Sequence, residues 1–183
     1  MRRRLNRAFT LIELMIVVAI VGILSVLAIY GVRKYVANAK TAEARNSLGQ
    51  IAKDAAAAVE REKGNNSLVP FGSTSALMRS FCSSSTTVPA SVPRGQKYQS
   101  QASDWTGTPQ AGWMCLKFVM DEPQYFSYRY TVSSTDPSTG GFTVTANGDL
   151  NGDSITSAFS VSGSASSGVV SISPNVQEAN PEE

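Results

Sequence analysis

One apolar run near the start of the chain constrains what the whole chain can fold into. Residues 8–30 read AFTLIELMIVVAIVGILSVLAIY, and Glu13 is the only charged residue among them. From Leu14 to Val32 there are 19 residues without a charge, close to the roughly 20 that a helix needs to cross about 30 Å of hydrocarbon. The run therefore predicts a membrane-spanning helix with one carboxylate close to its beginning.

Basic residues precede this run. Arg2, Arg3, Arg4 and Arg7 lie before it, and such a cluster predicts a cytoplasmic N-terminus by the positive-inside rule. No A-x-A-like cleavage site follows the run, which argues against an ordinary secretory signal peptide. A plain signal anchor fits the span but leaves Glu13 without a role, because a carboxylate costs roughly 2.5–3.5 kcal/mol at the bilayer centre and less near the surface.

Glu13 needs a partner, and a cut between Ala8 and Phe9 would supply one. The new α-amine of Phe9 would be positively charged near neutral pH and would lie about one helical turn from Glu13. It could also meet Glu13 of a neighbouring copy, because an amine and a carboxylate attract each other strongly where the dielectric constant is low. The pattern indicates a contact between subunits that serves assembly and not catalysis.

These residues resemble a known family. The arginine-rich leader, a small residue and then FTLIELMIVVAIVGIL are similar to the class III signal of type IV prepilins and type II secretion pseudopilins, and the resemblance covers roughly residues 1–63. It implies cleavage between Ala8 and Phe9 by a prepilin peptidase, N-methylation of Phe9, and pairing of Glu13 with that amine during filament assembly. Gly22 stands where the family usually has glycine.

The resemblance also implies partners and a location. A family member polymerises with copies of itself and with other pilins, on an inner-membrane assembly platform. It begins as a single-pass protein in the lipid bilayer of the bacterial inner membrane, with a cytoplasmic N-terminus. It ends in a pilus (fimbrium) on the cell surface or in a periplasmic pseudopilus.

Two residues depart from the family pattern. Ala8 replaces the glycine that usually precedes the cut, and Tyr30 stands where many type IV pilins have a helix-breaking proline. The resemblance implies a type IV pilus subunit for adhesion, motility or DNA uptake. A type II secretion pseudopilin remains the alternative, and a membrane-anchored binding module that never polymerises is a further one.

Beyond the span, the pattern predicts that the helix continues as an amphipathic stem over residues 33–63. Apolar side chains recur at steps of three and four residues, which places them on one face of a helix. They are Val36, Ala39, Ala42, Leu48, Ile51, Ala52, Ala55 and Val59. The sequence GNN, directly after the stem, supplies the turn residues that end the helix.

The remainder of the chain predicts a globular head. Residues 64–113 are rich in Ser, Thr, Pro and Gly and predict irregular structure, with a short helix around Ser75–Phe81. Alternating apolar residues then predict short antiparallel strands. These strands cover residues 117–121, 124–133, 141–149, 154–163 and 168–173.

A long helix followed by such strands predicts an α+β protein, and the resemblance implies the pilin fold, in which the helix packs on a small antiparallel sheet. The expected order is a cleaved basic leader, a transmembrane assembly helix, the stem, the head and a flexible acidic tail. Their bounds are 1–8, 9–32, 33–63, 64–173 and 174–183.

Composition and charge argue against several functions. The chain has no histidine, so it lacks the commonest general base and metal ligand. Residues 64–183 hold five basic and nine acidic groups, so charge does not predict nucleic-acid binding. No nucleophile, base and orienting group stand in a catalytic pattern, and no nucleotide-binding signature is present. We therefore expect no enzyme and no catalytic residues.

Two cysteines predict a disulfide. If the head lies in an oxidising compartment, Cys82 and Cys115 would close a loop of about 30 residues and contribute roughly 3 kcal/mol. Two unrelated buried thiols are the alternative.

One turn resembles a calcium loop. In ANGDLNGDS, Asp149, Asn151 and Asp153 alternate as ligands do at the start of an EF-hand loop. Ser154 stands where such a loop needs glycine, and Ser160 where it needs glutamate. We expect a tight β-turn and no cofactor, with calcium at Asp149, Asn151 and Asp153 as the open alternative.

Overall fold

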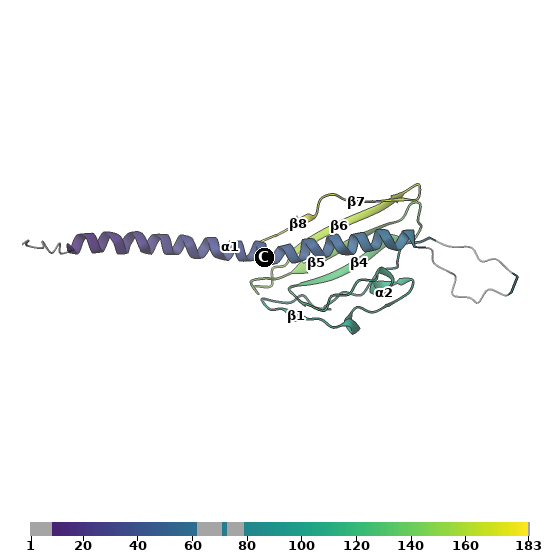
Figure 1. Ribbon diagram of the computed structural model, residues 1–183, viewed down its shortest axis with the longest axis horizontal. Helices are drawn as coiled ribbons and strands as arrows, with labels where there is room; N and C mark the ends of the chain where they lie inside the picture. The colour runs from purple at the N-terminus through teal and green to yellow at the C-terminus, as the bar shows by residue number, and fades with distance from the viewer. Residues whose placement is uncertain (1–8, 62–70, 73–78, 183) are drawn as a thin grey trace, which may run out of the picture. The chain divides into compact units, whose positions relative to one another are not determined.

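The computed structural model describes residues 9–61, 71–72 and 79–182. Figure 1 shows its helices and strands, with the labels used below. The chain divides into two units, Met1–Ala37 and Asn38–Glu183, and each is described by itself.

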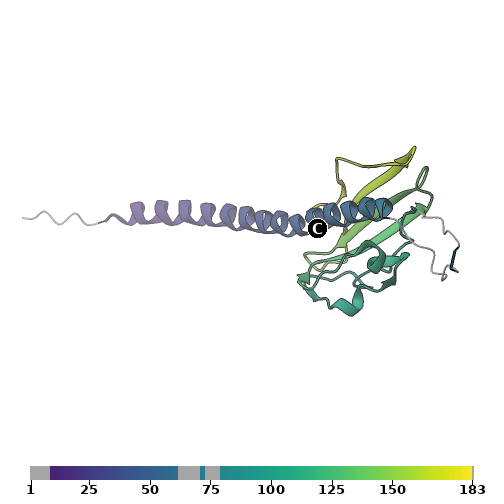
Figure 2. The same ribbon diagram turned by 45° about the vertical axis from the view of Figure 1, so that its right-hand side comes forward.

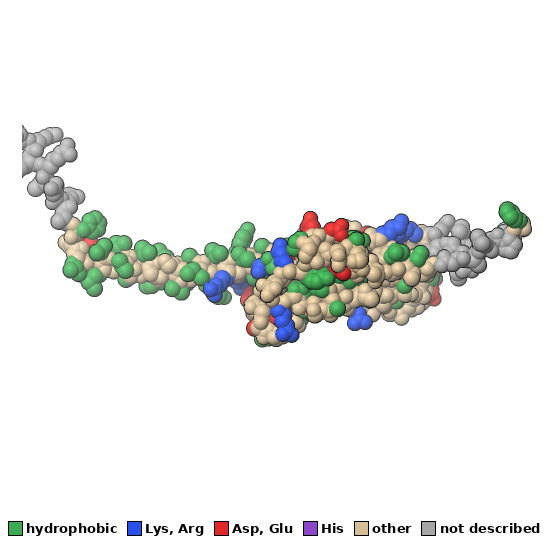
Figure 3. All heavy atoms as spheres, turned by 90° about the horizontal axis from the view of Figure 1, so that it is seen from below, with side chains coloured by type: hydrophobic (Ala, Val, Ile, Leu, Met, Phe, Trp, Pro, Cys, Tyr) green, Lys and Arg blue, Asp and Glu red, His purple; other side chains and the backbone are tan. Residues whose placement is uncertain are grey.

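The first unit is dominated by the long helix α1, which runs from Leu11 to Glu60 and continues into the second unit. By length and composition, α1 is able to cross a membrane. Apolar side chains from Leu11 to Val32 are exposed, and Figure 3 shows hydrophobic side chains along the whole visible face of this segment. The predicted apolar helix is therefore continuous, and it buries none of this apolar surface against the residues that the structure describes.

Within the second unit, α1 buries one face. The buried residues recur at steps of three and four, as expected for one side of a helix. They are Thr41, Ala44, Ser47, Leu48, Ile51, Ala52, Ala55, Ala58 and Val59. The predicted apolar stripe is confirmed from Leu48 onward.

The stripe differs from the prediction nearer the start of this unit. Ala39 and Ala42 are exposed, whereas Thr41 and Ser47 are buried. Small hydroxyl residues let the helix approach its neighbours closely, and a hydrophobicity pattern does not find them. The predicted end at residue 63 also differs: α1 ends at Glu60, and residues 62–70 lie outside the described part.

A five-stranded antiparallel sheet forms most of the head. Its main path runs in sequence order, β4–β5–β6–β7, and a fifth strand, β8, pairs with the other half of β6. The bounds are β4 Phe126–Ser134, β5 Gly141–Gly148, β6 Ser157–Ser166, β7 Val169–Ile172 and β8 Gln177–Ala179. Figures 1 and 2 show the part of α1 that belongs to the second unit lying across one face of this sheet. The prediction of an α+β fold with a helix against a small antiparallel sheet is confirmed.

Alternation along the strands builds the core. The inward residues are fully or almost fully buried and share one cluster with the buried face of α1. They are Phe126, Tyr128, Tyr130, Phe142, Val144, Ala146, Phe159 and Val161. The outward positions of β6 are mostly serine, as expected for the solvated face of a sheet covered on one side. The aromatic residues of β4 are thus core residues.

The segment before the main sheet forms a second layer of short elements. Strand β1, Tyr98–Gln99, pairs with β3, Pro123–Gln124. Between them lie η1 (Ala102–Asp104), β2 (Gly107–Thr108) and the short helix α2 (Gly112–Leu116). Three aromatic rings hold this layer together: the Trp105 centroid lies 4.9 Å from that of Trp113 and 5.2 Å from that of Phe118.

Two elements predicted before the main sheet are not helices or strands in the described residues. The predicted strand at 117–121 is wrong, because Lys117 adopts a left-handed conformation with φ of 63° and ends α2. The predicted helix around Ser75–Phe81 falls largely on residues 73–78, outside the described part. Arg79, Ser80 and Phe81 are not helical.

The expectation of a flexible acidic tail at 174–183 is corrected for part of that segment. Gln177–Ala179 form β8, which pairs with Ala158–Ser160 of β6. Glu178 is the residue of this strand that faces α1, and it binds Arg45 there. Composition alone indicated a solvated tail. In the structure, the free edge of β6 pairs with this segment and Arg45 binds its carboxylate.

Candidate functional site: the start of α1 and its junction with the head

The first turn of α1 holds Glu13 in a capping box. The backbone N–H and the hydroxyl of Thr10 both donate to Oε2 of Glu13, at 2.9 and 2.7 Å. In return, the Glu13 N–H donates to Oγ1 of Thr10 at 3.3 Å. This reciprocal arrangement satisfies N–H groups that the helix itself leaves without partners. The sequence T-L-I-E carries the signature of this motif, so the capping role of Glu13 is readable from the sequence beside its charge.

The residues predicted to act in processing and assembly fall at this end of the chain. Phe9 directly precedes the cap and is 81% exposed, whereas Ala8 lies outside the described residues. Gly22 follows Glu13 along α1, and a Cβ added at Gly22 would meet nothing within 4 Å among the described residues. Packing against the described part of the chain therefore does not explain a glycine at this position.

A second carboxylate, Glu43, joins α1 to the sheet within the second unit. Its Oε1 accepts a hydrogen bond from the Tyr125 N–H at 3.0 Å and another from the Tyr128 hydroxyl at 3.2 Å. Burial raises the pKa of Glu43, while these hydrogen bonds and the charge of Lys97 act in the opposite direction. The pKa of Tyr128 is raised by its burial and by the nearby Glu43 carboxylate.

Two lysines lie over the ring of Tyr125. The Nζ of Lys40 is 4.7 Å from the ring centroid and the Nζ of Lys97 is 4.8 Å from it, within the range of a cation–π contact. Together with Glu43, they place charges of both signs around Tyr125, the residue before β4. The sequence did not indicate this cluster, because Glu43 and Tyr125 are 82 residues apart.

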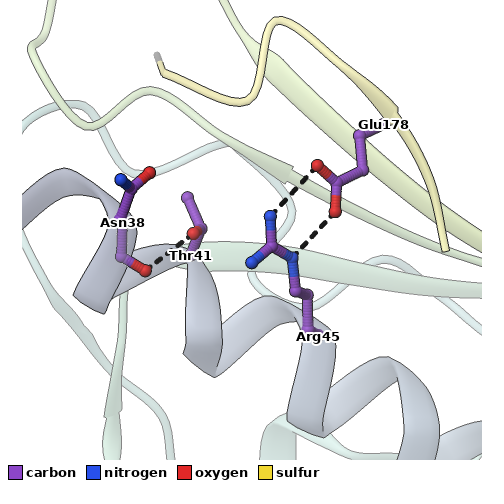
Figure 4. A network of polar contacts seen from close by, with 4 residues as sticks. All are labelled: Asn38, Thr41, Arg45 and Glu178. Atoms are coloured by element: carbon purple, nitrogen blue, oxygen red, sulfur yellow. Dashed lines mark hydrogen bonds and ion pairs between the residues drawn. The ribbon is translucent and has the colours of Figure 1, made fainter. Parts of the chain in front are cut away.

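Arg45 fastens the last strand to α1. Its Nε and Nη2 donate to the two carboxylate oxygens of Glu178, at 2.8 and 3.0 Å, and Figure 4 shows this two-bond pair. The guanidinium carbon of Arg45 also lies 5.9 Å from the Phe159 ring centroid. One turn before Arg45, the Thr41 hydroxyl donates to the Asn38 carbonyl at 2.8 Å.

The predicted disulfide between Cys82 and Cys115 is present. The backbone on both sides of the bond is tied to the core: the Tyr130 hydroxyl donates to the Cys82 carbonyl at 3.2 Å, and Nη2 of Arg61 donates to the Cys115 carbonyl at 3.1 Å. The disulfide is therefore linked to β4 through Tyr130 and to the residue after α1 through Arg61.

The calcium-like segment forms a hydrogen-bonded turn. Asp149 is almost completely buried, and its two carboxylate oxygens accept from the N–H groups of Gly152 at 2.6 Å and Ser154 at 3.0 Å. Asp153 accepts from the Ile155 N–H at 2.7 Å. Within the described residues, no group of three or more histidine, cysteine or acidic side chains is arranged to hold a metal ion.

The fold and the site together define a class of protein. Its members have a membrane-anchoring apolar helix with one carboxylate in the first turn, and this helix continues into an α+β head. A family model described as the prokaryotic N-terminal methylation motif matches residues 3–29. That match contains Ala8, Phe9, Glu13 and Gly22.

Three known proteins with pilin or fimbrial names are similar to part of this chain. The type IV major pilin protein PilA of Myxococcus xanthus is 58% identical over 43 residues, which is 24% of this chain and 20% of PilA. The fimbrial protein EcpC of Eikenella corrodens is 47% identical over 49 residues, 27% of this chain and 32% of that protein. The type IV major fimbrial protein FimA of Dichelobacter nodosus is 45% identical over 49 residues, 27% of this chain and 31% of FimA.

The similar segment spans between a fifth and a third of the length of these relatives. No solved structure matches the chain. The chain carries the N-terminal methylation motif at residues 3–29 and is similar to type IV major pilins over part of its length, so the predicted family resemblance is confirmed.

Proposed function

We propose that this chain is the precursor of a type IV pilus subunit, which polymerises through α1 into a filament. The observation that carries the proposal is an apolar helix exposed on all sides, with one carboxylate held in its first turn. The similarity of this segment to type IV major pilins supports the same conclusion.

The exposed apolar side chains of α1 from Leu11 to Val32 are stable only in an apolar environment. Burying one large aliphatic side chain contributes about 1.5–3 kcal/mol, and the segment from Leu11 to Val32 exposes more than a dozen of them. Lipid covers this surface before assembly, and the equivalent helices of neighbouring copies cover it afterwards. The same helix thus serves as membrane anchor and as the core of the filament.

Processing supplies the partner of Glu13. A prepilin peptidase cuts between Ala8 and Phe9 and methylates the new amine, at the cytoplasmic side of the inner membrane. The amine of Phe9 then meets the Glu13 carboxylate of a neighbouring copy as the assembly platform adds subunits. Thr10 holds that carboxylate with two hydrogen bonds, and Gly22 leaves room for a neighbouring helix to approach.

The head needs no chemistry for this role. It is a stable body that carries the loops and the outward sheet face to the surface of the filament. Adhesion, motility and DNA uptake are the activities that a pilus of this kind serves.

Two substitutions at one position test the proposal. Glu13→Val removes both the charge and the capping oxygen, whereas Glu13→Gln removes the charge and keeps an acceptor for Thr10. Both variants should be cut and held in the membrane, yet both should be missing from sheared surface filaments. Ser25→Ala, in the same helix, is the matched control and should assemble normally.

The pair of variants separates the two roles of Glu13. Filaments made by Glu13→Gln, but not by Glu13→Val, would mean that helix capping and not charge is required. Normal filaments from Glu13→Val would contradict the proposed assembly contact altogether.

A further inference from the structure

A pocket of about 320 Å³ opens on the surface of the head, beside the segment that leads into β1. Its walls combine apolar side chains with two cations and one phenol ring. The lining residues are Pro89, Ser91, Val92, Pro93, Arg94, Gln96, Lys97 and Tyr98. A volume of this size is at the small end of the range for ligand pockets, which is about 300–1,000 Å³. It suits a single sugar-sized ring.

The start of the pocket segment is fixed to the sheet. Val88 exchanges two backbone hydrogen bonds with Tyr128 of β4, at 3.0 and 2.8 Å. The buried side-chain amide of Gln124 also donates to the Val88 carbonyl at 3.1 Å. The wall that begins at Pro89 is therefore anchored to the core.

The middle and end of the segment are fixed as well. The Gly95 N–H donates to the Asp149 carbonyl at 2.8 Å, and Gly95, with φ of +61°, lies against Gly152 of the same turn. Tyr98 pairs with Gln124 in the β1–β3 ladder. The calcium-like turn thus supports the backbone beside Arg94, and the pocket is formed before any ligand arrives.

Arg94 supplies a cation that the described part of the chain does not neutralise. Its side chain is exposed, and among the described residues it makes no hydrogen bond or ion pair. This is unusual for an acidic head: of the five basic residues in 64–183, two line this one pocket. The second, Lys97, lies over Tyr125 and is partly offset by the carboxylate of Glu43.

We propose that this pocket binds the carboxylate of a small acidic sugar. The planar fork of Arg94 matches a carboxylate with two parallel hydrogen bonds, while Pro89, Val92 and Pro93 give the sugar ring an apolar wall. Tyr98 is held in place because its hydroxyl donates to Asp104 at 2.9 Å. Inorganic phosphate has no ring to contact this apolar wall, so the pocket should hold it more weakly than an acidic sugar. The proposal concerns the head alone and does not depend on polymerisation.

Binding of glucuronate to the full chain in non-ionic detergent micelles tests this proposal. Ligand-observed NMR titrations should detect glucuronate and should show no binding of glucose, which has the same ring without the carboxylate. Inorganic phosphate should bind more weakly than glucuronate. Arg94→Gln should weaken glucuronate binding about tenfold, as expected for the loss of one charge-assisted pair.

Arg129→Gln is the matched control, because Arg129 is an exposed arginine on the outward face of β4. It should bind glucuronate as the unchanged chain does. The proposal is overturned if glucuronate does not bind, if glucose or phosphate binds as tightly, or if the two arginine variants weaken binding equally.

Discussion

Glu178 of β8 and Arg45 of α1 form a two-bond ion pair that links the last strand of the sheet to the helix. Both side chains are partly exposed, so the pair contributes modestly to the free energy of unfolding, on the order of 0.5 kcal/mol. Its effect should be local, on the ordering of the short strand β8, which is also paired with β6.

Glu178→Gln should therefore free β8 without unfolding the head. We expect amide hydrogens at 177–179 to exchange faster, while those of β5 and β6 keep their protection. Glu122→Gln removes an exposed acid elsewhere and is the control. Unchanged exchange at 177–179 in Glu178→Gln would show that strand pairing alone holds this segment.

Burial of Glu43 makes the stability of the head depend on pH. Its pKa is raised in the folded chain, so the stability that it contributes is present below the pKa of an unfolded glutamate, about 4.3. That contribution is lost as the pH rises through the folded pKa. Glu43→Gln removes this dependence and keeps an oxygen that accepts from Tyr125 and Tyr128.

Chemical unfolding at several pH values measures the effect. Near pH 4, Glu43→Gln and the unchanged chain should have similar free energies of unfolding, and at pH 7 the variant should be equal or more stable. Glu43→Ala should be less stable at both pH values, by about 1–3 kcal/mol, because it leaves the Tyr125 N–H without a partner. A Glu43→Gln variant that is less stable only at pH 7 would contradict the assigned pKa direction.

Reduction of the Cys82–Cys115 disulfide should destabilise the head by roughly 3 kcal/mol. The same loss is expected for Cys82→Ser combined with Cys115→Ser, measured by chemical unfolding without reductant. Non-reducing gels should show no alkylatable thiol in the folded, oxidised chain. Free thiols in a fully stable head would contradict the bond.

Asp149 should stabilise its turn without a metal ion. Because both of its oxygens accept backbone N–H groups, Asp149→Ala should cost about 1–3 kcal/mol, equally in calcium and in a chelator. A melting temperature of the unchanged chain that rises with calcium, and does not rise in Asp149→Ala with Asp153→Ala, would instead establish an ion site.

Periodicity predicted the elements that bury one face against the core. The alternation of Phe126, Tyr128 and Tyr130 correctly predicted the inward face of β4. The steps of three and four residues correctly predicted the buried face of α1 from Leu48 onward. These patterns succeed because one face of each element meets one large core.

Predictions failed where a distant partner decides the structure. Residues 117–121 alternate like a strand, but the disulfide at Cys115 and the left-handed Lys117 place them after a helix. The partners of Glu43 and Glu178 are Tyr125 and Arg45, which only the fold brings to them. No local pattern contains that information.

We propose that the mature chain begins at Phe9 and assembles through that terminus and Glu13. Intact-mass and N-terminal peptide mass spectrometry of the protein purified from its filaments are the sharpest test of this processing. We expect Phe9 as the first residue, with one added methyl on its amine. A functional protein that retains Met1 and the arginines up to Arg7 would contradict it.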